Sequence, residues 1–484
     1  MSDLARVGGA LACLGVAALY VAARPRDRLV ALGAAALGTV LLGAGLASGN
    51  GVEAAVGTAG ALVVAVVLAA LYRWLPWLLP ALALATVPVR VHALGHQLLV
   101  PLYVSILGGA VLIGWQLARG DGRRRELRLA TWPLAAFVAW TGLSLLWTSD
   151  VHAGGVELLA FYLPFSMLAL GLARLPWSTV WLRLLSLELA VMGLVFAAVG
   201  FYQYDTRNIF ENPKLHNSNA YAAFFRVNSV FWDPSVYGRF LVVAMLPVLV
   251  LVVRGRSTRA AFAGLAVLVV LWLGLLISFS QSSFAALLAA VVIVAAVAWR
   301  WRAIAAVALA VLVLAGIAVT EPKVRHSLVH HTSSGLNSAT SGRYSLVANG
   351  IRIALAHPVG GVGVGGFHDA YVARVGKHAF SASHTAPVTV AAESGLVGLA
   401  FLLALVAAVL ADGFRRIDRS FAGRASLVFA LGVAAIFVHS FFYNDFVEDP
   451  TTWGLIGLVA LAASRRGEAQ EPLPAAENKE AVPA

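Results

Sequence analysis

Two polar segments hold most of the residues of this chain that could bind an anion or move a proton. They are residues 204–235 and residues 320–386, and both are set between long apolar runs. The second segment holds seven of the twelve histidines together with several arginines. Charged side chains are costly inside a bilayer, so a polar segment between apolar runs is a candidate active site.

In the first segment, Arg226 opens the sequence RVNSVFWDPSVYGRFL, among aromatic residues and close to Asp233. A guanidinium keeps its charge at a membrane surface and matches phosphate oxygens in pairs, so Arg226 is a candidate ligand for a diphosphate head group. The alternative is a surface ion pair between Arg226 and Asp233 that orders the loop. Arg207 and Arg239 are expected to contact lipid head groups.

The second segment predicts a helix from Tyr344 to Ala356 that is too short to span a membrane. We expect it to lie along the outer membrane surface, with Leu346, Ile353 and Leu355 against lipid or protein. Arg343 stands at its N-terminal end, where backbone N–H groups also favour anions. Arg343 is therefore the second candidate ligand for a diphosphate.

A histidine and a glutamate follow in the sequence. His384 comes just before the apolar run that begins near Pro387, at the depth of the outer interface. A neutral imidazole at this place is suited to be a general base, and the alternative is a hydrogen-bonded structural histidine. Glu393, inside the next apolar run, is either the partner of His384 or a buried polar residue.

Two further patterns carry weaker chemistry. His326 and His330 have the spacing of metal ligands on a helix, but no carboxylate or cysteine set accompanies them, so we predict neither a metal nor another cofactor. Gly361, Gly363 and Gly366 satisfy G-x-G-x-x-G without the strand and acidic residue of a dinucleotide site. Loop reversal is the expected role of these glycines, and close backbone approach to a phosphate or sugar is the alternative.

The elements that position these residues are predicted to be membrane helices. Hydrophobic residues make up 60% of the chain and charged residues 12%, with a mean hydropathy of +0.84, which excludes a soluble globular protein. The apolar runs fit helices that cross a hydrocarbon core of about 30 Å, and the alternation of β-barrel strands does not dominate. Cys13 is the single cysteine, which excludes a disulfide framework and a thiolate metal cluster. The predicted fold is an all-α, polytopic integral membrane protein.

We expect about 12–15 transmembrane helices. The fifteen candidate spans are residues 8–23, 29–47, 54–72, 75–90, 98–118, 131–147, 155–173, 181–203, 236–253, 261–279, 282–299, 302–319, 387–411, 424–443 and 451–464. The span 75–90 holds three prolines and the span 451–464 is short, so both could be bent or re-entrant. Residues 1–466 then form one transmembrane domain, and residues 467–484 form a disordered cytoplasmic tail.

The net charge of +12 is explained by membrane topology rather than by nucleic acid. Arginine supplies 31 of the 35 basic residues, and most of these lie in short connections beside apolar runs. Every second connection is basic, which predicts an N-terminus outside the cell and a C-terminus in the cytoplasm. Both long polar segments then lie outside, where long loops are exempt from the positive-inside rule.

The order of the motifs resembles the O-antigen ligase and O-antigen polymerase superfamily of bacterial membranes. That order is a Gly-Arg pair, then HPVGGVGVGGF, then a histidine, then ESGLVG opening an apolar run. RVNSVFWDPSVYGRFL resembles the first arginine-bearing outer loop of the same family. The resemblance runs from Phe201 to Leu403, and LSLLWTSD and HSFFYNDFVEDPTTWGLIGL are similar to its less specific ends.

The resemblance implies a GT-C-type glycosyltransferase of the bacterial cytoplasmic membrane, with its active site on the extracytoplasmic side. Such an enzyme takes a glycan from undecaprenyl diphosphate and passes it, with inversion and without a metal or cofactor, to a hydroxyl of a glycan, lipid or protein acceptor. Carried over to this sequence, Arg226 and Arg343 bind the diphosphate and His384 activates the acceptor. The family includes ligases, polymerases and protein O-oligosaccharyltransferases.

The chain departs from the family pattern at two places. Relatives often carry Ser-Arg in the helix corresponding to SFSQSSFAAL, where this chain has Gln281, and His-Asn where it has His384 and Thr385. The missing cation implies weaker diphosphate binding, compensation by Arg239 or Arg352, or a different donor.

The alternative function is a flippase or secondary transporter of a lipid-linked or anionic sugar, whose arginines would gather the substrate at a vestibule. Transport coupling usually needs ionisable residues near the bilayer midplane, and the predicted spans hold few beyond Glu157, Glu188 and Glu393. A purely structural scaffold gives no reason to concentrate seven histidines in one outer loop.

Overall fold

The protein is a bundle of membrane helices, as the sequence predicts. The computed structural model describes residues 2–47, 51–93, 96–210, 212–221, 224–255, 257–300, 302, 305, 342–376, 382–415, 417–418 and 420–464. Within these residues, ten helices are long and apolar enough to cross a membrane, and Ala59–Trp74 and Pro450–Ser464 are shorter apolar helices. The fold is therefore an all-α, multi-pass membrane protein.

The helices of the first half are α1 (Ser2–Val21), α2 (Pro25–Leu46), α3 (Gly51–Trp74), α4 (Leu78–Thr86), α5 (Val100–Ala118), α6 (Thr131–Ser144), α7 (Val151–Glu157), α8 (Leu163–Ala173) and α9 (Thr179–Thr206). A 3-10 turn (Arg128–Ala130) precedes α6, and a π-helical turn (Leu158–Tyr162) joins α7 to α8. The later helices are α10 (Pro213–Tyr221), α11 (Pro234–Arg254), α12 (Thr258–Ser278), α13 (Gln281–Trp299), α17 (Arg343–Ala356), α18 (Phe367–Val375), α19 (Ala386–Phe414), α20 (Phe421–His439) and α21 (Pro450–Ser464).

One expected span is wrong. Residues 75–90 do not form a spanning helix: α4 has nine residues, and the chain then forms an antiparallel hairpin of β1 (Val91–Ala93) and β2 (His96–Leu98). Proline explains the short helix, because Pro76 precedes it and Pro88 follows it, and neither ring is compatible with a continuous helix. The expected span 302–319, the histidines at 326 and 330, and the tail 467–484 lie outside the described residues.

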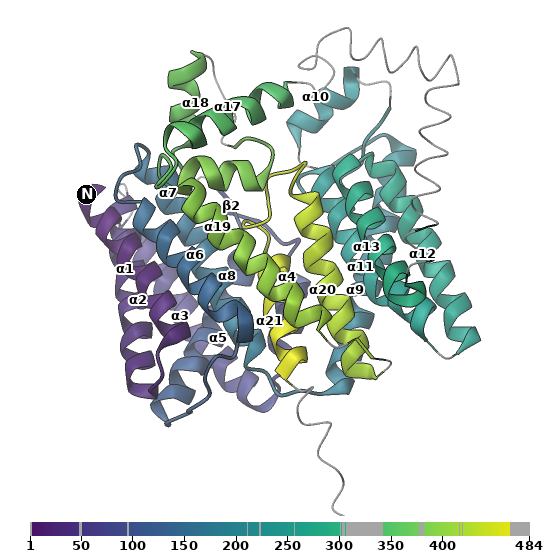
Figure 1. Cartoon of the computed structure of the whole chain (residues 1–484), viewed down its shortest axis with the longest axis horizontal. Helices are drawn as coiled ribbons and strands as arrows, with labels where there is room; N and C mark the ends of the chain where they lie inside the picture. The colour runs from purple at the N-terminus through teal and green to yellow at the C-terminus, as the bar shows by residue number, and fades with distance from the viewer. Residues whose placement is uncertain are drawn as a thin grey trace, which may run out of the picture.

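Helices α1 and α2 pack unusually closely because glycines face each other's backbone. A Cβ added at Gly38 would lie 2.3 Å from the backbone N of Ala12, and one added at Gly15 would lie 2.5 Å from the backbone N of Ala35. Small residues allow this approach, which favours van der Waals packing where the surrounding lipid supplies no hydrophobic driving force. The pair forms one side of the bundle (Figure 1).

A buried ion network ties the loop between α5 and α6 to α2 and α8. Arg28 is 1% exposed, and its Nη1 lies 2.8 Å from Oε1 of Glu126. Arg174 is 5% exposed and pairs with Glu126 and, at 2.8 Å, with Oδ2 of Asp121. These arginines stand in connections whose positive charge we assigned to topology, and the structure gives two of them a packing role as well.

Helices α10, α17 and α18 lie together at one end of the bundle, beyond the ends of the long helices (Figure 1). The turn between α1 and α2 lies at the opposite end (Figure 1). The described parts of the two long polar segments, 204–235 and 342–386, therefore meet at the same end of the molecule, as the alternation of basic loops predicts.

Candidate active site

Arg226 is held in place by α10 and by the end of α12. The side chain of Asn219, on α10, clamps the backbone of Arg226: its Oδ1 accepts from the Arg226 N–H at 3.1 Å, and its Nδ2 donates to the Arg226 carbonyl at 2.9 Å. Nε of Arg226 donates to the carbonyl of Ser278, the last residue of α12, at 3.2 Å. Within the described residues, the other N–H groups of the guanidinium make no hydrogen bond, so they can meet a ligand.

Arg343 is the first residue of α17, so the helix predicted from Tyr344 to Ala356 is confirmed to within one residue. Gly342 precedes it with a φ of +82°, a left-handed conformation that suits glycine. Leu346 and Ile353 are buried as expected, whereas Leu355 is 65% exposed. The Arg343 side chain is exposed at the N-terminal end of the helix, where the helix dipole adds to its attraction for anions.

His384 lies in a constrained turn immediately before α19. Its φ is +65°, which is uncommon for a residue other than glycine and marks stored backbone strain. Hydrogen bonds on both sides fix the turn: Ser383 Oγ donates to the carbonyl of Thr385 at 2.9 Å, and the N–H of Ala386 donates to the carbonyl of Ser440 at 2.9 Å. The imidazole is half-buried.

The three residues come from separate elements but share one electrostatic environment. Burial lowers the pKa of Arg226, the charge of Arg343 lowers it further, and Asp233 opposes both. Burial likewise lowers the pKa of His384 below its ordinary value, with Arg343 again lowering it and Asp233 raising it. Both Arg343 and Asp233 therefore act on both Arg226 and His384, and the imidazole is neutral at pH 7.

The alternative role for Arg226, an ion pair with Asp233, is not what the structure shows. None of the ion pairs among the described residues joins these two side chains. Asp233 instead caps α11, since its Oδ1 accepts from the N–H of Ser235 at 2.7 Å. The Asp233 carboxylate therefore caps α11 through its hydrogen bond, and it acts on Arg226 and His384 through space.

The glycine segment 360–366 is a docking loop rather than a phosphate loop. Gly361, Gly363 and Gly365 have φ values of +65°, +92° and +73°. The N–H of Gly363 donates to the carbonyl of Glu393 at 2.8 Å, and the N–H of Leu396 donates to the carbonyl of Pro358 at 2.7 Å. The loop amides thus bond to α19, which opens at Gly395 to receive them.

Glu393, on α19, holds this docking loop in place. It is 5% exposed, and its Oε1 accepts from the N–H of Phe367, the first residue of α18, at 3.4 Å. It also lines a small cavity of about 40 Å³ with Glu157 and Glu448. Its position fits the reading of a buried polar residue that supports α18.

Arg239 is not placed as a surface head-group contact. It is 6% exposed and pairs with Asp445 and, through Nε at 3.3 Å, with Asp449. Nδ1 of His439 lies 3.5 Å from Oδ1 of Asp445, and Nε2 of the same ring lies 2.9 Å from Oγ of Ser282. This buried chain of polar groups joins α11, α13, α20 and the segment before α21, and two carboxylates balance the charge of Arg239.

Two further residues bear on the missing family arginine. They are Arg352, a possible substitute, and Gln281, which replaces it, and they lie in different surroundings. Arg352 is exposed on α17 and nine residues beyond Arg343, about 13 Å along the helix axis, so it does not join the same group. Gln281 is exposed as the first residue of α13, three residues after the Ser278 carbonyl that holds Arg226. The uncharged Gln281 therefore stands in the helix in which the family resemblance implies an arginine.

A cavity of about 340 Å³ lies beside this group, and we call it the polar cavity. Its wall includes Asp233 and Tyr443, and Tyr443 also acts on Arg226. Arg90, Arg239 and Glu448 line it as well. Sequence reasoning gave no role to Arg90 or Tyr443, although seven polar or charged residues within HSFFYNDFVED were a usable signal.

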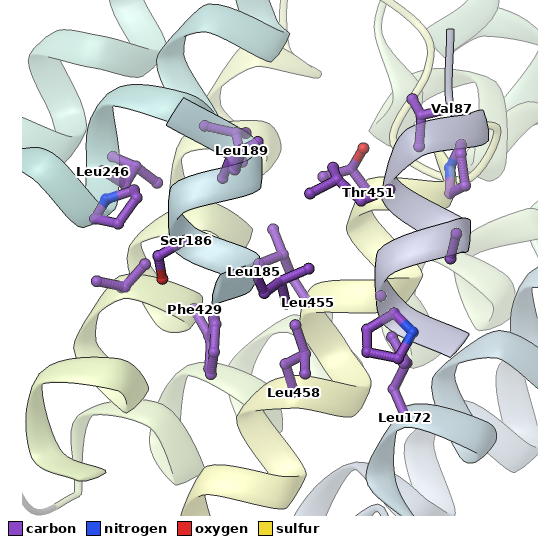
Figure 2. Close-up of a pocket in the computed structure, with 18 of the residues that line it drawn as sticks. Val87, Leu172, Leu185, Ser186, Leu189, Leu246, Phe429, Thr451, Leu455 and Leu458 are labelled. Carbon is purple, nitrogen blue, oxygen red and sulfur yellow. The ribbon is translucent and has the colours of Figure 1, made fainter. Parts of the chain in front are cut away.

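A second cavity, of about 100 Å³, lies deeper among the spanning helices, and we call it the apolar cavity. Leu185 and Leu189 of α9 stand on one side of it and α4 stands on the other, with α8, α11, α20 and α21 completing the wall (Figure 2). Val87 and Pro450 line both the apolar and the polar cavity. The two cavities therefore adjoin each other.

Comparison with known proteins agrees with the resemblance of the motifs. Residues 266–403 match the O-antigen ligase family, a region that runs from within α12 to within α19. It contains Gln281, Arg343, His384 and Glu393 but not Arg226. No curated protein matches the sequence. The matched region, the multi-pass helical fold and the order of the motifs together support the resemblance of this chain to the O-antigen ligase and polymerase superfamily.

Proposed function

We propose that the protein transfers or polymerises a glycan from undecaprenyl diphosphate onto an acceptor hydroxyl at the outer face of the bacterial cytoplasmic membrane. The observation that carries this proposal is the convergence of Arg226, Arg343 and His384 from three separate elements. Two cations beside one neutral base suit a reaction in which a diphosphate leaves and a hydroxyl attacks.

The arginines stabilise the leaving group. As the bond between the anomeric carbon and the phosphate oxygen breaks, its electron pair stays on the diphosphate, which gains negative charge. Guanidinium groups neutralise this charge through paired hydrogen bonds, and here they take the part that a metal ion plays in other transferases. The N-terminal end of α17 adds the N–H groups of its first turn.

His384 acts on the acceptor. The neutral imidazole removes the hydroxyl proton while the acceptor oxygen forms its bond to the anomeric carbon, from the side opposite the diphosphate, so the configuration at that carbon inverts. A positioned base of this kind contributes about 100- to 10,000-fold in rate. Burial and Arg343 lower the pKa of His384, which keeps the base unprotonated at neutral pH.

Release of undecaprenyl diphosphate from an extracted lipid-linked glycan tests the proposal. We expect the wild-type protein in liposomes to release it in the presence of EDTA, and Arg343→Ala and His384→Ala to lose at least 100-fold of this rate. Arg374→Ala, at the exposed end of α18, is the matched control and should keep the activity. Movement of intact lipid-linked glycan across the bilayer without any release would overturn the transferase and support the flippase.

A further inference from the structure

The polar cavity contains an arginine that the proposed reaction does not use. Arg90 follows α4 and precedes the β1–β2 hairpin, and its guanidinium lines the cavity with Tyr103 and Tyr443. None of the ion pairs among the described residues includes Arg90. A cation that forms no ion pair within the described part of the chain, and that faces a cavity in a membrane protein, is available for an anionic ligand.

Among the carboxylates of the same cavity, Glu448 acts on Arg90 through space, whereas the others are engaged elsewhere. Asp445 and Asp449 both pair with Arg239, and Asp233 caps the N-terminal end of α11. Glu448 keeps a surface toward the cavity, but the protein surrounds it, and this burial raises its pKa to about 7. The raised pKa of Glu448 favours its protonated form, which can donate a hydrogen bond to a phosphate oxygen.

The apolar cavity adjoins the polar one at Val87, three residues before Arg90 in the sequence. Its lining is almost wholly leucine, valine, proline, alanine and phenylalanine from spanning helices (Figure 2). At the other end, the polar cavity reaches Asp233 and Tyr443, which act on Arg226. The apolar cavity, Arg90 in the polar cavity and the candidate active site around Arg226 are therefore neighbours, in that order.

We propose that the two cavities form the binding site of the lipid part of the donor, with the prenyl chain nearest the head group in the apolar cavity and Arg90 on its diphosphate. This inference rests on the proposed function for the identity of the lipid. Arg90 then supplies a third cation to the diphosphate, beside Arg226 and Arg343.

Binding of defined lipids to the full-length protein, by native mass spectrometry, tests the inference without turnover. The probes are undecaprenyl diphosphate, undecaprenyl phosphate and phosphatidylglycerol. We expect the wild type to prefer the diphosphate, Arg90→Gln to bind it about tenfold more weakly, and Arg90→Lys to keep most of the affinity. In Arg90→Gln, the ratio of the affinities for undecaprenyl diphosphate and undecaprenyl phosphate should be smaller than in the wild type. A general folding defect would weaken both lipids and leave this ratio unchanged.

A pair of variants on α9 tests the apolar cavity. Leu185→Trp fills the cavity and should weaken both prenyl lipids, whereas Leu187→Trp changes a side chain that is 58% exposed outside the cavity and should not. Equal unfolding temperatures of the two variants would show that a difference in lipid binding does not come from a difference in folding. Unchanged diphosphate binding in Arg90→Gln, equal binding in the two tryptophan variants, or phosphatidylglycerol binding as tight as the diphosphate would overturn the site.

Failure of this inference and failure of the proposed function are distinguishable. Prenyl diphosphate binding that depends on Arg90, in a protein that releases no diphosphate from the glycan donor, would overturn the transferase and leave the lipid site standing. Release by the wild type with no effect of Arg90→Gln on binding would overturn the lipid site alone.

Discussion

Asp233 and Arg343 act on the imidazole of His384 in opposite directions. Arg343 lowers the pKa of His384 and Asp233 raises it. Asp233→Asn removes the raising charge but keeps an N-cap for α11, because asparagine caps helices as well as aspartate does. We therefore expect the pKa of His384 to fall and the acid limb of the pH–rate profile to move to lower pH. The profile of kcat/KM for the free enzyme measures this shift.

The reverse change supplies the check on this prediction. Arg343→Gln removes a charge that lowers the pKa of His384, so the acid limb of its residual activity should move to higher pH. Asp369→Asn, on the exposed side of α18, is the matched control and should leave the limb in place. An acid limb at the same pH in all four proteins would mean that His384 is not the base.

The residues of the candidate site could be named from the sequence, but their relations could not. The helix that begins at Arg343 was predictable from apolar periodicity and its proline-marked end, and His384 from its place before an apolar run. The pairing of Arg239 with Asp445 and Asp449 joins residues about 200 positions apart, which no local pattern indicates. Arg90 was missed because the stretch around it was read as a spanning helix.

The break in α19 determines how α17 and α18 sit on the bundle. Gly395 has a φ of +69° and a ψ of −177°, a region open essentially to glycine, and an added Cβ would lie 2.1 Å from the carbonyl oxygen of Val359. We expect Gly395→Ala to destabilise the protein by about 2–3 kcal/mol. Transfer should also be impaired, because the loop that carries α18 can no longer dock onto α19. Thermal unfolding in detergent, alongside the release assay, measures both effects.

Gly360→Ala is the control from the same loop. A Cβ at Gly360 would meet only the ring of Trp147, at 3.2 Å, and Trp147 is 41% exposed and can move. This variant should fold and act nearly as the wild type does. Equal stability of the two alanine variants would show that the docking of the loop into α19 does not contribute to the fold.

The network around Glu126 makes a second prediction about how the helices are held. Glu126 pairs with both Arg28 and Arg174, whose side chains are 1% and 2% exposed. Glu126→Ala leaves two buried guanidinium groups with a single carboxylate, Asp121, near one of them. We expect a loss of about 3–5 kcal/mol of stability, the range for breaking a buried pair. Unfolding by denaturant measures it, and Asp27→Ala, an exposed acid on α2, should cost less than about 1 kcal/mol.

The fold class followed from composition and pattern, because only helices and closed barrels span a bilayer and the long apolar runs lack the alternation of barrel strands. Hydropathy located most helices, but it does not report backbone geometry, so residues 75–90 were read as a span although their prolines stop α4 after nine residues. It also assigned every arginine of the basic loops to topology. Arg28 and Arg174 show that the same residue can orient a helix and neutralise a buried carboxylate.

Orientation in the membrane remains a property of the whole molecule that a labelling experiment decides. Cys13 is the only cysteine and is buried, so Cys13→Ala gives a background without thiols. Arg374→Cys places a thiol on exposed α18, beside the candidate site, and Arg124→Cys places one in the exposed loop between α5 and α6 at the other end of the bundle (Figure 1).

The alternation of basic loops predicts that α18 faces outward and the Arg124 loop faces the cytoplasm. A membrane-impermeant maleimide added to spheroplasts should therefore label Arg374→Cys at once, and Arg124→Cys only after the membrane is permeabilised. The opposite pattern would place Arg226, Arg343 and His384 in the cytoplasm. Transfer at the outer face would then be impossible, because the same helices carry both ends of the bundle and fix them on opposite sides of the bilayer.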